Sequence, residues 1–263
     1  MSRIADTFAS LSSQNRKGFI PFITAGDPDL ETTKHLIIEL ARLGSTLIEL
    51  GIPFTDPMAD GPVIQRASER ALQNPFGIAE VLRIVSAARQ ETDVPIILFS
   101  YFNPLLQFGV ERLAREARNA GIDGVLVTDM VPEEAEAFAT ELKRNELDMI
   151  FLIAPTSTDE RLRLVAERAS GFIYAVSRAG ITGAREAMSA EAEKLVRRMR
   201  QFSNLPIAVG FGISKPEHVA DVWRYADAAV VGSAIVDRME KAKNSATVVK
   251  EIGEFTASLF TSK

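Results

Sequence analysis

Two carboxylates, Glu49 and Asp60, flank a stretch of sequence suited to acid–base chemistry. Glu49 is near the end of an apolar run, residues 46–50, which predicts a buried strand. Burying an ionised group there is costly without a purpose. Asp60 follows in a proline-containing loop that ends at Pro62, a residue suited to the first turn of a helix. One carboxylate can donate a proton while the other stays charged, which is the arrangement that general acid–base catalysis needs.

Each carboxylate also has a purely structural interpretation. Glu49 can turn toward solvent where its strand ends, and Asp60 can cap the helix that begins after Gly61. The sequence leaves both interpretations open.

The elements that position these residues alternate regularly along the chain. Short apolar runs predict eight strands, at residues 19–23, 46–50, 95–100, 124–128, 149–153, 172–176, 207–209 and 228–231. Amphipathic segments predict helices at residues 3–11, 32–43, 63–73, 78–89, 110–120, 133–144, 159–169, 189–201 and 216–225, with a last helix after the eighth strand.

Continuously apolar strands that alternate with amphipathic helices indicate a parallel sheet covered on both faces. Eight such units favour an α/β fold of the (β/α)8 TIM-barrel type, with a short extra N-terminal helix, over an open doubly wound sheet. We expect residues 1–263 to form a single TIM-barrel domain. Barrel enzymes place their chemistry on the loops that follow the strands, where Glu49 and Asp60 lie.

Glycines after the last strands indicate a phosphate site. Gly212 lies in the turn after the seventh strand, and Gly232 and Ser233 directly follow the eighth. Glycine lets backbone amides approach an anion, and a helix N-terminus adds its positive end. Gly183, after the sixth strand, offers a further amide. Each turn alone is ordinary, but the pair on adjacent strands favours a phosphate cradle.

Large apolar residues at the same end of the strands predict a pocket for a flat, hydrophobic group: Phe22, Phe99, Leu126, Ile153 and Phe211. Tyr101 and Tyr174 lie near the same end. Their hydroxyl groups are equally consistent with structural hydrogen bonds. Together with the phosphate cradle, these residues indicate a ligand with an aromatic head and a phosphorylated tail.

The composition excludes several classes of function. The net charge of -5 over 263 residues argues against a nucleic-acid surface. The absence of cysteine excludes disulfides and thiolate metal sites, and two histidines make a histidine-rich metal site improbable. No apolar run is long enough for a membrane span and no signal core is visible, so we expect a cytoplasmic protein.

The loop at residues 177–188 is long and contains Gly180 and Gly183 as pliable points. We expect it to act as a lid over the site. Thr182, between the two glycines, could then reach Asp60 with its hydroxyl group; in the alternative interpretation it is only a turn residue.

The motifs resemble those of the tryptophan synthase alpha chain family. The longest is E-L-G-I-P-F-T-D-P-M-A-D-G-P-V-I-Q at residues 49–65. Further matches are P-F-I-T-A-G-D-P at 21–28, Y-F-N-P at 101–104, S-R-A-G-I-T-G-A at 177–184, V-G-F-G-I-S at 209–214 and V-V-G-S-A at 230–234.

The resemblance implies retro-aldol cleavage of indole-3-glycerol phosphate to indole and glyceraldehyde 3-phosphate. It implies that Glu49 is the general acid and base and that Asp60 stabilises positive charge on the indole ring. Tyr174 matches a tyrosine beside the family's substrate, and Gly183, Gly212, Gly232 and Ser233 match its phosphate-binding positions. With Phe22, Tyr101, Thr182 and Phe211 as further substrate-binding residues, these make up the predicted site.

The resemblance also implies a partner, the tryptophan synthase beta chain, in an alpha2-beta2 heterotetramer, docked on the loop that contains Asp60. The chemistry requires no metal or redox cofactor, and the pyridoxal phosphate of the family's beta chain is not assigned to this chain. The alternatives are a stand-alone indole-3-glycerol phosphate lyase, another sugar-phosphate barrel enzyme, and a catalytically silent allosteric subunit.

Overall fold

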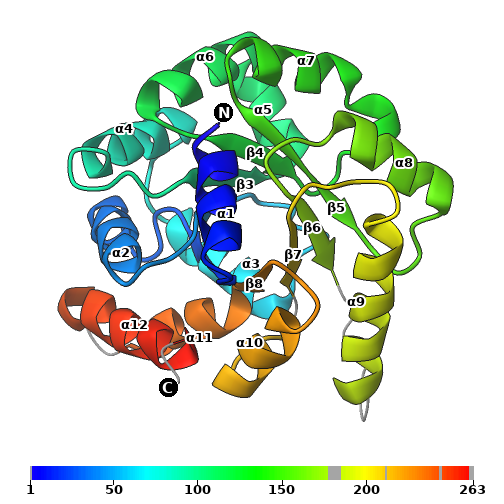
Figure 1. The fold of residues 1–263 in the computed structure, drawn as a ribbon. Coiled ribbons are helices and arrows are strands. Elements are labelled where there is room, and N and C mark those ends of the chain that lie inside the picture. Colours follow the sequence, from blue (N-terminus) through cyan, green and yellow to red (C-terminus); the bar gives the residue numbers. More distant parts are fainter. Residues whose placement is uncertain (1, 177–184, 211, 243–244, 261–263) are drawn as a thin grey trace.

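A closed barrel of eight parallel strands forms the centre of the computed structural model (Figure 1), which describes residues 2–176, 185–210, 212–242 and 245–260. The strands follow one another around the barrel in chain order, and β8 closes it by pairing with β1. They are β1 (Gly18–Thr24), β2 (Ile48–Gly51), β3 (Ile96–Ser100), β4 (Gly124–Val127), β5 (Asp148–Ile153), β6 (Ile173–Val176), β7 (Ile207–Gly210) and β8 (Ala228–Val231).

Helices surround the barrel and cover its outer face and its ends (Figure 1). They are α1 (Arg3–Ser13), α2 (Leu30–Arg42), α3 (Pro62–Ala71), α4 (Ile78–Ala88), α5 (Phe102–Phe108), α6 (Val110–Ala120), α7 (Glu136–Arg144), α8 (Asp159–Arg168), α9 (Arg185–Met199), α10 (Pro216–Trp223), α11 (Ser233–Lys241) and α12 (Ser245–Phe260), with a 3-10 turn, η1 (Pro132–Glu134), before α7.

The core has two layers because successive side chains of a strand point to opposite faces. Outward residues such as Ile48 and Leu50 pack against the helices in one large cluster. Inward residues such as Ile20, Leu47 and Ile97 fill the barrel in a second cluster. Glu49, between two outward residues, therefore points into the barrel.

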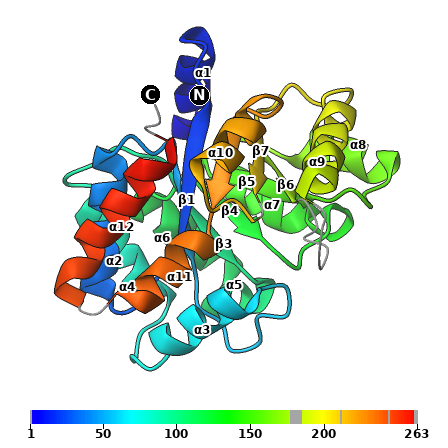
Figure 2. The same cartoon turned by 90° about the horizontal axis from the view of Figure 1, so that it is seen from below.

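The two ends of the barrel are built differently. Ile4 and Phe8 of α1 pack onto the interior cluster and cover the end at which the strands begin. Figure 2 shows α1 at one end and α3 and α5 at the other. The loops that follow the strands are at the end opposite α1, so this is the end at which barrel chemistry is expected.

The predicted barrel is confirmed, and all eight strands lie within two residues of their predicted positions. Four details of the predicted helices were wrong. Helix α5 was not predicted, the last helix is divided into α11 and α12, α9 begins at Arg185 instead of residue 189, and the segment at 133–144 is interrupted. At this interruption the Pro132 carbonyl accepts a hydrogen bond from the Arg168 guanidinium, which competes with continuous helical bonding.

Within the described ranges, none of the helices combines the length and apolar character needed to cross a lipid bilayer.

Candidate active site

Glu49 is buried without a partner. Its register places it between Phe22 of β1 and Ile97 of β3. The residue is 1% exposed, and neither carboxylate oxygen has a hydrogen-bond partner among the described residues. This burial raises the pKa of Glu49 well above its usual value. The carboxyl group therefore keeps its proton at pH values at which an exposed glutamate has lost it, and it can act as an acid.

Tyr174 of β6 faces the same interior as Glu49. Its hydroxyl group lies against Gly210 of β7, where a Cβ atom would be 2.0 Å from the hydroxyl oxygen. Only glycine leaves room for the tyrosine there. Burial, and secondly the charge of Glu49, raise the pKa of Tyr174 well above its usual value. Tyr174 and Glu49 are thus electrostatically coupled, and the phenol stays protonated.

Asp60 lies at the end of the loop between β2 and α3. Desolvation by burial raises its pKa to about 6, against a smaller opposite effect of a hydrogen bond from the Tyr101 hydroxyl. Helix α3 has Gly61 as its N-cap and no side-chain cap, so the helix-capping alternative for Asp60 is wrong. The carboxyl group is therefore available to the cavity and is mostly ionised at neutral pH.

Tyr101 fixes the Asp60 loop to the end of β3. Its hydroxyl oxygen accepts a hydrogen bond of 2.9 Å from the backbone N–H of Ala59. On the other side, the Gln65 amide donates to the Asp60 carbonyl at 2.9 Å. Burial and the adjacent Asp60 charge raise the pKa of Tyr101 to about 12, so its hydroxyl stays a donor. Asp60 is held from both sides.

A small cavity brings Asp60, Tyr101 and Phe22 together, with Phe99 in the same wall. The Phe22 and Phe99 rings contact each other edge to face, with their centroids 5.3 Å apart. The expectation for Ile153 is wrong: it packs in the outer layer between strands and helices, while its neighbour Leu152 packs against the barrel interior with Leu126.

Sequence reasoning missed six residues that line this cavity: Thr24, Gly51, Ile52, Ile64, Ser68 and Ser100. Thr24 could have been found, because it is two residues after Phe22 on β1 and therefore points to the same face. Ser68 and Ile64 come from α3, whose inward side the sequence does not reveal.

The candidate phosphate cradle lies on the adjacent strands β7 and β8. Gly232 is the N-cap of α11, and the exposed Ser233 is its first residue. Gly212 follows β7 with φ +62°, a conformation that favours glycine. Gly232 is also close to Phe22, since a Cβ atom there would be 3.3 Å from the Phe22 Cβ. The cradle and the aromatic wall are therefore neighbours.

Three predicted site residues, Thr182, Gly183 and Phe211, lie outside the described residues. The same holds for residues 177–184 of the expected lid. Its last four residues, 185–188, belong instead to helix α9.

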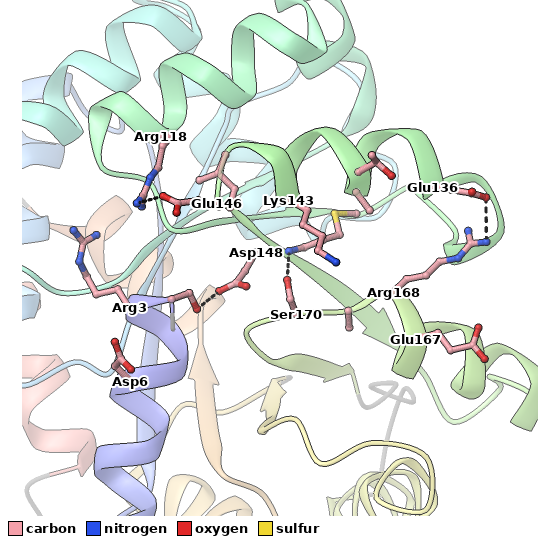
Figure 3. Close-up of a pocket in the computed structure, with 16 residues that line it drawn as sticks. Arg3, Asp6, Arg118, Glu136, Lys143, Glu146, Asp148, Glu167, Arg168 and Ser170 are labelled. Atoms are coloured by element: carbon pink, nitrogen blue, oxygen red, sulfur yellow. Dashed lines mark hydrogen bonds and ion pairs between the residues drawn. The ribbon is translucent and has the colours of Figure 1, made fainter.

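A larger cavity of about 770 Å³ lies at the opposite end of the barrel, beside α1 (Figure 3). Charged side chains line it, several already paired, such as Arg118 with Glu146 and Arg168 with Glu136. Ser2 at the start of α1 donates to Asp148 there, at 2.5 Å. These pairs hold α1 and α7 in place, and this end of a barrel normally serves stability.

The fold and the candidate site fit a (β/α)8-barrel enzyme that uses two carboxylates with different proton affinities. The aromatic wall and the glycine turns fit a substrate with an aromatic and an anionic part.

Comparisons with known proteins agree with this class. Residues 8–261 match the model of the family described as tryptophan synthase alpha chain. The chain is 49% identical over 259 residues to the tryptophan synthase alpha chain of Solibacter usitatus (strain Ellin6076), covering 98% of this chain and 97% of the relative. It therefore belongs to the tryptophan synthase alpha chain family, and it is a carbon–carbon lyase of tryptophan biosynthesis that cleaves indole-3-glycerol phosphate.

Solved structures give the same result. The crystal structure of tryptophan synthase subunit alpha from Legionella pneumophila str. Paris superposes with a TM-score of 0.91 at 37% identity, covering 98% of this chain and 97% of the other. A structure described as the tryptophan synthase a2b2 complex from Pyrococcus furiosus has a TM-score of 0.86 at 38% identity, covering 92% and 97%.

Proposed function

We propose that Glu49 is the general acid and base of the cleavage. In its protonated form it donates its proton to the indole ring carbon that carries the side chain. As a carboxylate it then accepts the proton of the adjacent side-chain hydroxyl, while the carbon–carbon bond breaks and its electron pair returns to the ring. Indole and an aldehyde leave, and Glu49 regains its proton.

Asp60 stabilises the charge that develops in this sequence. Protonation of the ring carbon makes the indole ring cationic, and an ionised carboxylate opposite it lowers the energy of that state. With its pKa of about 6, Asp60 is mostly charged at neutral pH, whereas burial raises the pKa of Glu49 well above its usual value and so favours its protonated form. The different environments of two carboxyl groups support this division of roles.

The observation that carries the proposal is the burial of Glu49 without a partner. A buried carboxyl group normally has a hydrogen bond or an ion pair, because losing water is costly. Glu49 has neither among the described residues, although it lies beside the interior cluster of the barrel. An unpaired acid at the reactive end of a barrel is difficult to explain as a structural residue.

The remaining site residues bind the substrate in this proposal. Phe22, Tyr101 and Tyr174 hold the indole group, together with Thr182 and Phe211. Backbone groups at Gly212, Gly232 and Ser233 hold the phosphate at the N-terminus of α11, together with Gly183. The closeness of Gly232 to Phe22 supports one continuous substrate site.

We also propose a beta chain as partner, docked at the loop between β2 and α3. Met58 in this loop is 86% exposed and Leu106 of α5 is 51% exposed. A largely apolar hollow of about 300 Å³ is lined by Pro53 of the same loop, by Phe108 of α5 and by Phe76, among others. Exposed apolar surface of this kind favours a protein interface. The Pyrococcus furiosus relative forms an a2b2 complex, which supports an alpha2-beta2 heterotetramer here, in the cytoplasm.

The catalytic proposal is tested with Glu49→Gln. Indole release should fall to background, while indole-3-propanol phosphate, an analogue without the reactive hydroxyl, should bind with unchanged affinity. Glu111→Gln, at an exposed position of α6, is the control and should keep the wild-type rate. Substantial turnover by Glu49→Gln would remove Glu49 from the mechanism.

The partner proposal is tested by measuring turnover of the chain with and without a beta chain. Met58→Asp should weaken the complex and the activation that it causes, whereas Gln14→Asp, an exposed change just after α1 at the other end of the barrel, should not. Equal turnover with and without the beta chain, together with no binding, would favour the stand-alone lyase. No turnover in either condition would favour the silent allosteric subunit.

A further inference from the structure

Thr24, the last residue of β1, has a buried hydroxyl group without a hydrogen bond among the described residues. The residue is 2% exposed, and its backbone pairs with Gly51 of β2. A valine has the same shape and would fill this position without an unsatisfied polar atom. A buried hydroxyl of this kind requires an explanation.

Thr24 lines the cavity that also contains Asp60. Thr24 is on the inward side of β1, two residues after Phe22, and both residues line this cavity. Asp60 and Tyr101 form another part of the wall. The free space is of the order of one water molecule, and a buried water needs two to four polar partners, which this wall provides.

Two other hydroxyl donors in this wall, those of Tyr101 and Ser100, are already in use. The Tyr101 hydroxyl donates to the Asp60 carboxylate and accepts from the Ala59 N–H. The Ser100 hydroxyl donates to the Tyr101 carbonyl at 2.9 Å. An ionised carboxylate can accept about four hydrogen bonds, so a single phenol does not satisfy it. The Thr24 hydroxyl, in contrast, has no hydrogen-bond partner among the described residues and is available as a donor.

We propose that Thr24 is a positioning residue for Asp60: its hydroxyl donates, through one water molecule in the cavity, to the Asp60 carboxylate. The carboxylate is then held from two directions, by Tyr101 at the end of β3 and by Thr24 at the end of β1. This fixes its orientation toward the indole ring as positive charge develops there. The inference rests on the proposed role of Asp60 in the cleavage.

The chain offers a matched control at Thr256 of α12. Thr256 is also fully buried, and its hydroxyl also has no hydrogen bond among the described residues. It does not line the cavity of Asp60. Thr256→Val therefore removes the same kind of group with the same change of shape, away from the site.

The experiment compares Thr24→Val, Thr24→Ser and Thr256→Val by steady-state cleavage of indole-3-glycerol phosphate. Thr24→Val should lower kcat about tenfold, as expected for the loss of a hydrogen bond to a charged group, with KM within about twofold. Thr24→Ser keeps the hydroxyl and should stay within about threefold of wild type. Thr256→Val should keep the wild-type kcat. Thermal melting should show Thr24→Val at least as stable as wild type; if it does not fold, Thr24→Ala replaces it.

A double-mutant cycle separates this role from a general packing effect. Thr24→Val should have no further effect on kcat in an Asp60→Asn chain, because the group on which it acts is gone. Three results would overturn the proposal. Thr24→Val could keep the wild-type kcat, it could lower kcat as much in the Asp60→Asn chain as in the wild-type chain, or Thr24→Ser could be as slow as Thr24→Val. A wild-type rate of Asp60→Asn alone would instead overturn the proposed role of Asp60, and this inference with it.

Discussion

Tyr101→Phe should shift the pH dependence of cleavage, because the Tyr101 hydroxyl stabilises the charged form of Asp60. The pKa of Asp60 is about 6 with this hydrogen bond in place. A hydrogen bond to a charged group that is only partly buried is worth about one pKa unit, so the variant should have an Asp60 pKa of about 7. The variant should lose activity at acidic pH, because a higher pKa leaves a smaller fraction of Asp60 ionised there.

The loss of activity depends on pH, because kcat should follow the ionised fraction of Asp60. At pH 6 the ionised fraction falls from about one half to about one tenth, a loss of about fivefold. At pH 7 it falls from about nine tenths to about one half. At pH 8.5 the two proteins should have nearly equal rates. The acid limb of the pH profile of kcat therefore moves up by about one pH unit, and the plateau of kcat at high pH does not change.

The assay is kcat for indole release between pH 5 and pH 9, with KM and thermal stability measured in parallel. Tyr101→Phe also removes the acceptor of the Ala59 N–H, and a looser loop would lower kcat at every pH. Tyr225→Phe, at a tyrosine after α10, is the control. An unshifted acid limb in Tyr101→Phe would refute the reasoning, whether or not the plateau is lower.

Two further predictions concern the same site. Asp60→Asn should lower kcat by about a hundredfold or more, because it removes the charge opposite the cationic ring, and a rate within a few-fold of wild type in the steady-state assay would contradict its role. Gly210→Ala should displace Tyr174, since the new Cβ would lie 2.0 Å from its hydroxyl oxygen. We expect a raised KM, with an intact fold by circular dichroism. An unchanged KM would show that Tyr174 is not a substrate contact.

The strands could be predicted because each is a short apolar run between polar turns. Their inward and outward faces could not. Strand β5 is apolar on both faces, so it lacks the alternation that assigns a side, and Ile153 was placed in the pocket instead of Leu152. The choice is made by the register with β4 and β6, which is a property of the closed barrel.

Helix α5 shows a second limit of prediction. It is only seven residues long and contains Pro104, which usually argues against a helix. Pro104 is tolerated because it lies in the first turn, where backbone N–H groups have no partner within the helix. The Phe102 N–H is instead bound by the Asp129 carboxylate at 2.8 Å, a contact with the next strand's loop that the local sequence does not reveal.

The carboxylates themselves were found by type and spacing, and the chemistry required one of them to keep its proton while the other stays charged, but the contacts that set their pKa values were not found. Glu49 is surrounded by the barrel interior, while Asp60 has a phenol donor from Tyr101, at a distant position in the chain. Such differences arise from burial and long-range contacts. They become visible only when the loop after β2 meets the end of β3.

The unpaired burial of Glu49 should also lower the stability of the protein as the pH rises. Its pKa is raised in the folded state, so its contribution to stability is fully present below its unfolded pKa, near 4.5, and is lost as pH rises toward the folded pKa. Glu49→Gln does not titrate. Relative to wild type, it should therefore gain stability above about pH 5, by up to about 1.4 kcal/mol per pH unit until the folded pKa is reached.

The test is urea unfolding of both proteins from pH 4 to pH 8. The buried amide changes the unfolding free energy of the variant by the same amount at every pH, so the measured quantity is the slope, against pH, of the difference between the two unfolding free energies. A flat difference for Glu49→Gln would mean that Glu49 has the same pKa in the folded and unfolded states, and the argument for a buried acid would fail.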